Sequence, residues 1–259
     1  MNALEAFSPQ EFATVRDILV NKLLFSPSVN TSSQPKAVLL GGQSGAGKTT
    51  LHDIYRAFFN GNVAIINGDE YRSAHPRYYE LDKAYGPDAV KYTAAWSGQM
   101  TEALIDALSR THYNLVIEGT LRTSEVPLRP AAPLRERGYA VSLALMAVKP
   151  EISLLSCQIR YEQMRIAGTI PRATDPAHHL LIVESIVANL ATLEDSELFD
   201  EVCLYNRARK RLYPAESGSL ATCERASEAL REVLFGPWTD EERLHRRFLE
   251  QRLETLREQ

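Results

Sequence analysis

Residues 36–50 read Lys-Ala-Val-Leu-Leu-Gly-Gly-Gln-Ser-Gly-Ala-Gly-Lys-Thr-Thr, and this stretch decides the fold. The apolar run at 37–40 predicts a short buried strand, and residues 42–49 match the complete Walker A pattern G-x-x-x-x-G-K-[ST] ahead of a predicted helix. Glycines in such a loop let backbone N–H groups converge on one point, and the helix adds its positive N-terminal end, so a polyphosphate fits there. The predicted nucleotide-binding residues are Gly42, Gln43, Ser44, Gly45, Ala46, Gly47, Lys48, Thr49 and Thr50.

Two side chains of this loop have predicted roles in phosphate chemistry. We expect Lys48 to reach the β- and γ-phosphates of a nucleotide, and the Thr49 hydroxyl to complete the shell of a bridging Mg²⁺. No NKxD guanine-reading motif occurs in the sequence, which favours ATP over GTP.

The composition is that of an ordinary globular chain. Its 259 residues are 44% hydrophobic and 24% charged, enough to bury the core of one large α/β domain with appendages. A net charge of −4 gives no basic field for nucleic acid. Three widely spaced cysteines argue against a disulfide framework or a CxxC metal site, and we find neither a signal-peptide pattern nor a membrane-length apolar run. These features predict a cytoplasmic protein without a membrane partner.

Five short apolar runs alternate with helical patterns. Strands are expected at 37–40, 63–66, 115–117, 139–148 and 202–205. This alternation predicts an α/β fold of the P-loop NTPase or kinase type, with a parallel sheet and helices on both faces. Residues 1–34 are expected to form an N-terminal helix and linker, 35–238 the kinase domain, and 239–259 a charged helix.

Polar residues follow the second and third predicted strands. Asp69 comes just after the second, at an end that faces the ligand crevice in a parallel sheet, and is a candidate general base. Glu118 and Thr120 follow the third and suit either a substrate's hydroxyl groups or water around magnesium. Glu102 lies off the apolar face of a predicted helix that begins near Asp88, so it is either solvated or turned into the cleft.

Arginines later in the chain suggest a lid. Arg160 and Arg172 flank a loop after a long predicted helix, and their planar forks suit a transferring phosphoryl group. The basic cluster Arg207, Arg209, Lys210 and Arg211 follows the last predicted strand. For this cluster an exposed turn is favoured over contact with a base or phosphate.

Several motifs in fixed order together resemble the zeta toxin family over about residues 38–238. They are residues 42–49, 68–76, 113–123, 159–162 and 172–174. The resemblance implies ATP- and Mg²⁺-dependent phosphorylation of the 3′-hydroxyl of the sugar in UDP-N-acetylglucosamine, inhibition of cell-wall synthesis, and a small helical antitoxin partner. It also implies roles for single residues: Lys48 as the P-loop lysine, Asp69 as the base, Arg160 and Arg172 as phosphoryl clamps, Thr49 as the magnesium ligand, and Glu102, Glu118, Thr120 and Arg122 as the substrate pocket.

The chain departs from the family pattern at Asn67, Glu70 and Pro130, positions expected to be near the acceptor. Two other functions therefore stay open. One is a P-loop kinase with a different acceptor, such as a nucleotide or an antibiotic. The other is an ATP-binding switch that phosphorylates nothing, although a switch has no need of a base and two arginine clamps.

Overall fold

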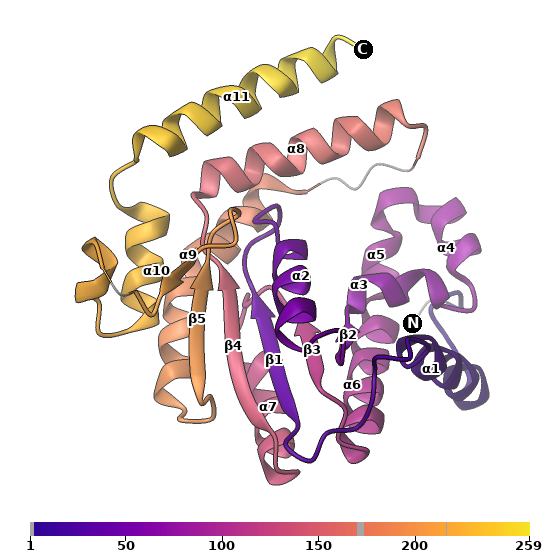
Figure 1. The fold of residues 1–259 in the computed structure, drawn as a ribbon. Helices are drawn as coiled ribbons and strands as arrows, with labels where there is room; N and C mark the ends of the chain where they lie inside the picture. Colours follow the sequence, from indigo (N-terminus) through magenta and orange to yellow (C-terminus); the bar gives the residue numbers. More distant parts are fainter. Residues whose placement is uncertain (1–2, 170–173, 216) are drawn as a thin grey trace.

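The computed structural model describes residues 3–169, 174–215 and 217–259, which contain a six-stranded sheet of order β2-β3-β1-β4-β5-β6 (Figure 1). The strands are β1 (Lys36–Gly41), β2 (Ala64–Ile66), β3 (Leu115–Glu118), β4 (Ala140–Met146), β5 (Glu201–Tyr205) and β6 (Arg211–Tyr213). Strands β1 to β5 pair in parallel, whereas β6 is antiparallel to β5. The predicted α/β class and parallel sheet are confirmed.

Helices cover both faces of this sheet (Figure 1). The helices are α1 (Pro9–Leu23), α2 (Thr49–Phe58), α3 (Gly68–Tyr71), α4 (Tyr78–Tyr85), α5 (Ala89–Tyr92), α6 (Ala94–Arg110), α7 (Glu125–Glu136), α8 (Pro150–Ile166), α9 (Pro176–Asp195), α10 (Ala226–Phe235) and α11 (Asp240–Arg257). Short 3₁₀ turns lie at Arg72–Ala74, Gly86–Asp88 and Ser219–Thr222.

The central strand β1 shows why the sheet needs two helical layers. Ala37 and Leu39 point into one core with α6, α7, α9 and α10, whereas Val38 and Leu40 point into a second core with α2, α8 and α11. All four side chains are at most 3% exposed. A strand buried on both faces reads as a continuous apolar run, which is the pattern at 37–40.

The structure differs from the sequence-based expectations in four local features. Residues 78–85, whose mixture of tyrosine and polar residues before Gly86-Pro87 is typical of a loop, form helix α4, and the helix expected from Asp88 is divided at Thr93 into α5 and α6. Helix α10 and edge strand β6 were not predicted. Helix α4 has 8 residues, α10 has 10 and β6 has 3, so hydrophobic periodicity carried little information about them.

Helices α1 and α11 pack on opposite sides of the molecule (Figure 1). Helix α1 begins at a capping box formed by Ser8 and Glu11, and Phe7 and Phe12 lie against Trp96 of α6, with ring centroids 4.9 and 5.4 Å away. Helix α11 packs along α8 and buries Leu249 and Leu253. Among the described residues, none of the helices has the length and apolarity required to cross a membrane.

Candidate active site

The Walker A residues form the connection between β1 and α2. Gly42, Gly45 and Gly47 have φ values of +137°, +75° and +96°, a region that residues with a Cβ rarely adopt. Helix α2 begins at Thr49, so its unpaired N–H groups and positive dipole end face the loop. The backbone is therefore shaped to receive an anion.

The packing around Gly45 also leaves no room for a side chain. An added Cβ would lie 2.1 Å from the backbone oxygen of Ser153 and 2.6 Å from the Cys157 sulfur, both on α8. The P-loop thus packs directly on the helix that carries Arg160. His179 of α9 is buried next to α8, with its Nε2 2.8 Å from the Ser153 hydroxyl oxygen.

Lys48 folds back over the loop. Its Nζ donates hydrogen bonds to the carbonyl oxygens of Gly42 at 3.0 Å and Gln43 at 3.5 Å. Burial lowers the pKa of Lys48, while the negative charges of Glu118 and Asp69 raise it and the positive charge of Arg160 lowers it. Four candidate residues from four different parts of the fold, namely the P-loop, α3, the end of β3 and α8, therefore share one electrostatic environment.

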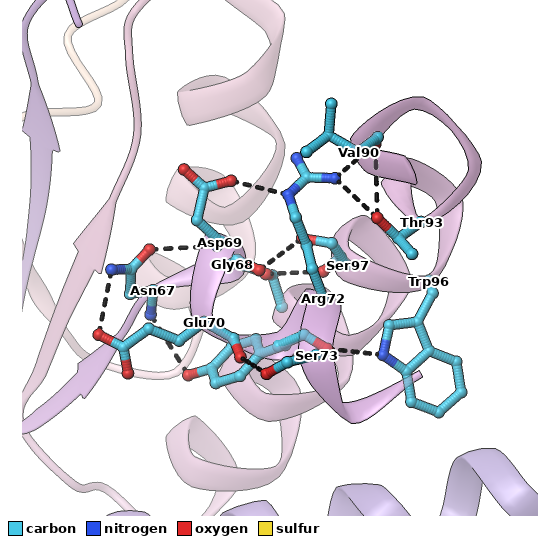
Figure 2. Close-up of polar contacts among 12 residues, drawn as sticks. Asn67, Gly68, Asp69, Glu70, Arg72, Ser73, Val90, Thr93, Trp96 and Ser97 are labelled. Atoms are coloured by element: carbon cyan, nitrogen blue, oxygen red, sulfur yellow. Dashed lines mark hydrogen bonds and ion pairs between the residues drawn. The ribbon is translucent and has the colours of Figure 1, made fainter. Parts of the chain in front are cut away.

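Asp69 lies in the first turn of α3, the short helix that follows β2. Asn67 caps this helix by accepting a hydrogen bond from the Asp69 N–H at 3.1 Å (Figure 2). The Asp69 side chain is 65% exposed, and its Oδ1 accepts a hydrogen bond from Nε of Arg72 at 2.9 Å. Arg72 also donates to the Val90 carbonyl at 2.8 Å, so the carboxylate has a fixed direction while one oxygen stays open to a ligand.

Helix α6 holds α3 in place (Figure 2). The Ser97 hydroxyl donates to the Gly68 carbonyl at 2.7 Å, and the indole N–H of the fully buried Trp96 donates to the Tyr71 carbonyl at 2.9 Å. A helix of four residues has little stability alone, since nucleation outweighs its few hydrogen bonds. Its position therefore depends on these two contacts.

Glu118 ends β3, the neighbour of β1, and its Oε2 lies 2.9 Å from Nε2 of His52 on α2. Its side chain is 18% exposed. Together with the Thr49 hydroxyl and the Asp69 carboxylate it offers hard oxygen donors, which are the ligands that Mg²⁺ prefers. The described ranges contain no group of three or more His, Cys, Asp or Glu side chains able to hold a metal ion.

The remaining predicted site residues have different environments. Arg160 is exposed on α8 and forms no ion pair within the described ranges, whereas Arg172 lies outside the described residues. Thr120 and Arg122 are exposed after β3, where Asn189 of α9 donates to the Arg122 carbonyl at 2.7 Å. Glu102 is half-exposed and pairs with Arg129 of α7.

Two residues at the site, Arg72 and His52, had no role predicted from the sequence, and a third, Arg207, was expected in an exposed turn. Arg72 follows Asp69 by three residues, and His52 follows Lys48 by four. Residues with these spacings lie on the same side of a helix, so Arg72 and His52 could have been expected near the two predicted site residues. Arg207 was expected in an exposed turn, but its side chain is half-buried and donates hydrogen bonds to the P-loop carbonyls of Gly45 and Ala46. No local pattern connects Arg207 with a loop that lies 161 residues earlier.

Comparison with known proteins gives consistent matches. The sequence model of the zeta toxin family matches residues 22–217. Toxin PezT of Streptococcus pneumoniae serotype 4 is 46% identical over 229 residues, covering 88% of this chain and 89% of that protein. Toxin zeta of Streptococcus pyogenes is 40% identical over 204 residues, covering 78% of this chain and 71% of that protein.

Solved structures agree with these matches. A structure of the PezAT chromosomal toxin–antitoxin system of Streptococcus pneumoniae has a TM-score of 0.89 and 40% identity, and the match covers 100% of both chains. The AvrRxo1-ORF1:-ORF2 complex, solved with ATP, matches with a TM-score of 0.56 at 14% identity, covering 99% of this chain and 92% of that one. The second likeness concerns the fold alone.

Proposed function

This chain belongs to the zeta toxin family, and we propose that it is the toxin of a toxin–antitoxin pair, acting as an ATP-dependent kinase of a nucleotide-sugar. The proposed acceptor is the 3′-hydroxyl of the sugar in UDP-N-acetylglucosamine. Its phosphorylation would withdraw a precursor of the cell wall. Membership of the zeta toxin family supports the reaction class, and the experiment below tests the acceptor.

The observation that carries the proposal is the approach of Asp69 to the P-loop. Asp69 follows β2 whereas the P-loop follows β1, yet the negative charge of Asp69 partly opposes the lowering of the Lys48 pKa that burial causes. A loop that only bound nucleotide would need no oriented, accessible carboxylate beside the phosphates. A kinase needs one, because the acceptor hydroxyl must be aligned and must lose a proton.

The bonds that form and break in the proposed transfer, and the proton that moves, can be assigned to these residues and to ATP. The acceptor oxygen forms a bond to the γ-phosphorus, the bond from the γ-phosphorus to the β,γ-bridging oxygen breaks, and the hydroxyl proton passes to Asp69. Lys48 and Arg160 offset the negative charge that spreads over the transferring group, and Arg172 is proposed for the same task. Thr49 would hold a Mg²⁺ together with phosphate oxygens, and that ion would supply further charge neutralisation. Glu102, Glu118, Thr120 and Arg122 are proposed to contact the nucleotide-sugar.

The test is direct. Purified protein is mixed with ATP, MgCl₂ and UDP-N-acetylglucosamine, and the products are separated and identified by mass spectrometry and phosphorus NMR. We expect ADP and a nucleotide-sugar heavier by one phosphoryl group, carried on the 3′-oxygen. Nucleotides and aminoglycosides offered as separate acceptors test the alternative kinase. ATP binding without transfer to any acceptor would favour a switch instead.

The partner is part of the same proposal. The solved relative with the TM-score of 0.89 is a toxin–antitoxin system, which supports a protein partner for this chain. We expect a small helical protein encoded next to this chain to bind it and to stop the transfer reaction. Co-purification with a neighbouring gene product, followed by the same kinase assay, measures both effects.

A further inference from the structure

Arg207 lies in the turn between β5 and β6, and its side chain extends along the outside of the P-loop. Its Nε donates to the carbonyl oxygen of Ala46 at 3.1 Å, and its Nη2 donates to the carbonyl oxygen of Gly45. Its Cγ lies 3.6 Å from the point that a Cβ on Gly47 would occupy. One guanidinium therefore bridges two consecutive carbonyl groups of the loop.

These contacts fix the direction of the loop's N–H groups. A trans peptide unit is planar, so its C=O and its N–H point in opposite directions. With the Ala46 carbonyl held by Arg207, the N–H of Gly47 points in the opposite direction within the same peptide plane. The preceding peptide unit is held at both ends, because the Gly45 carbonyl accepts from Arg207 and the Ala46 N–H donates to the Gln43 carbonyl at 3.1 Å.

The charge of Arg207 has no carboxylate counterpart in the part of the chain that the structure describes. Arg209, in the same turn, forms an ion pair with Asp53 of α2 at 2.8 Å, whereas the hydrogen bonds of Arg207 go to carbonyl oxygens. Burial lowers the pKa of Arg207, which reflects the cost of keeping this cation away from water. A half-buried cation beside an anion cradle is stabilised when an anion arrives.

We propose that Arg207 is a positioning residue of the P-loop: it holds the carbonyls of Gly45 and Ala46 outward, keeps the loop open to phosphates, and adds positive charge to the attraction for a polyphosphate. This inference rests on the proposed function only in assuming that the loop binds a nucleoside triphosphate. The identity of the acceptor does not enter it.

The test measures affinity for inorganic tripolyphosphate and for ATP by isothermal titration calorimetry. Charge-assisted hydrogen bonds of this kind predict that Arg207→Ala weakens tripolyphosphate binding by about tenfold to a hundredfold. Arg207→Lys keeps the charge but loses the fork, so we expect it to recover part of the affinity. The matched control Arg209→Ala, two residues along the same turn, should stay within about twofold of the unsubstituted protein because it leaves the loop carbonyls untouched.

A purely structural role predicts another result. In that case Arg207→Ala would lower the melting temperature of the ligand-free protein, while the folded fraction bound tripolyphosphate with unchanged affinity; that result would overturn the inference. Equal losses in Arg207→Ala and Arg209→Ala would also overturn it, because they would indicate a general effect of charge. If the unsubstituted protein binds tripolyphosphate but phosphorylates no nucleotide-sugar, the proposed function fails and the inference stands. If it binds neither tripolyphosphate nor ATP, both fail.

Discussion

Burial lowers the pKa of Lys48 and the negative charge of Asp69 opposes that change, yet the two residues are proposed to act on different parts of the reaction. Lys48 is attached to the P-loop and would bind the nucleotide before and during transfer. Asp69 stands on α3 and would contact only the acceptor. Substitutions at the two positions should therefore separate binding from chemistry.

Replacing Asp69 by Asn tests that separation. The change keeps the shape of the side chain but removes its ability to take a proton, and general-base catalysis of this kind contributes about 10²- to 10⁴-fold. We expect kcat for the nucleotide-sugar to fall by that amount while the Kd for ATP changes by less than about twofold. Lys48→Ala should instead weaken ATP binding itself. Full activity in Asp69→Asn would remove the proposed base.

Gly45 offers a second test at the residue scale. In Gly45→Ala the new Cβ would meet the Ser153 carbonyl oxygen at 2.1 Å in a backbone with φ of +75°, so both strain and overlap oppose it. We expect a loss of about 2–4 kcal/mol in the free energy of unfolding, measured with urea. The control is Gly98→Ala at an exposed position of α6, where no atom beyond the neighbouring backbone of the helix lies within 4 Å of the new Cβ. That change should stabilise by about 0.5–1 kcal/mol, because alanine favours helices.

At the scale of elements, the position of α3 depends on a chain of contacts that reaches the N-terminus. Trp96 holds the Tyr71 carbonyl at the end of α3 and packs against Phe7 and Phe12 of the N-terminal segment. Glu11 of α1 pairs with Arg77, just before α4. Helix α1 thus supports the part of the molecule that presents Asp69.

The pairing of Glu11 has a consequence for acid stability. Hydrogen bonds from the Arg77 side chain, and then from the Ser8 backbone and hydroxyl, lower the pKa of Glu11 to about 2. A carboxylate with a lowered folded-state pKa contributes stability that is complete above its ordinary value of 4.5 and is lost as the pH falls from there to about 2.

We therefore expect Glu11→Gln to be less stable than the unsubstituted protein at pH 6 and to approach its stability by pH 2.5. Urea unfolding of both proteins across this range gives the difference, in which the other carboxylates cancel. Parallel stability curves for the two proteins would show that the ion pair does not stabilise the folded state.

Elements were predictable from sequence where their own pattern was strong. The apolar run of β1 followed by the Walker A residues predicted the strand, the loop and the start of α2 correctly. Strand β6 and helix α4 were missed because they have 3 and 8 residues, too few to show a clear period, and they are stabilised by packing on β5 and on neighbouring short helices. The same limit explains the site: Asp69 could be predicted from its place after a strand, but the support from Trp96 and the contact of Arg207 with the loop depend on tertiary packing.

On the scale of the whole molecule, two cores lie on the two faces of one sheet. Strand β1, which leads into the P-loop, contributes side chains to both cores. The P-loop itself lies beside α2 and α8, which both belong to the second core. Helix α11 forms the outer layer of that second core through Leu249 and Leu253. We propose that residues 239–259, although a separate segment in sequence, unfold together with the kinase domain.

Leucine substitutions along α11 test this cooperation. Leu253 is 4% exposed against α8, so Leu253→Ala should cost about 2–5 kcal/mol of unfolding free energy. Leu244, 66% exposed on the same helix, is the matched control, and Leu244→Ala should stay within about 0.5 kcal/mol. Trp238 lies next to α11 and Trp96 lies on α6, so tryptophan fluorescence and far-UV circular dichroism together report both sides of the molecule. A single urea transition, coincident by both probes and shifted as a whole in Leu253→Ala, is expected; an early transition confined to helix signal would show that α11 unfolds independently.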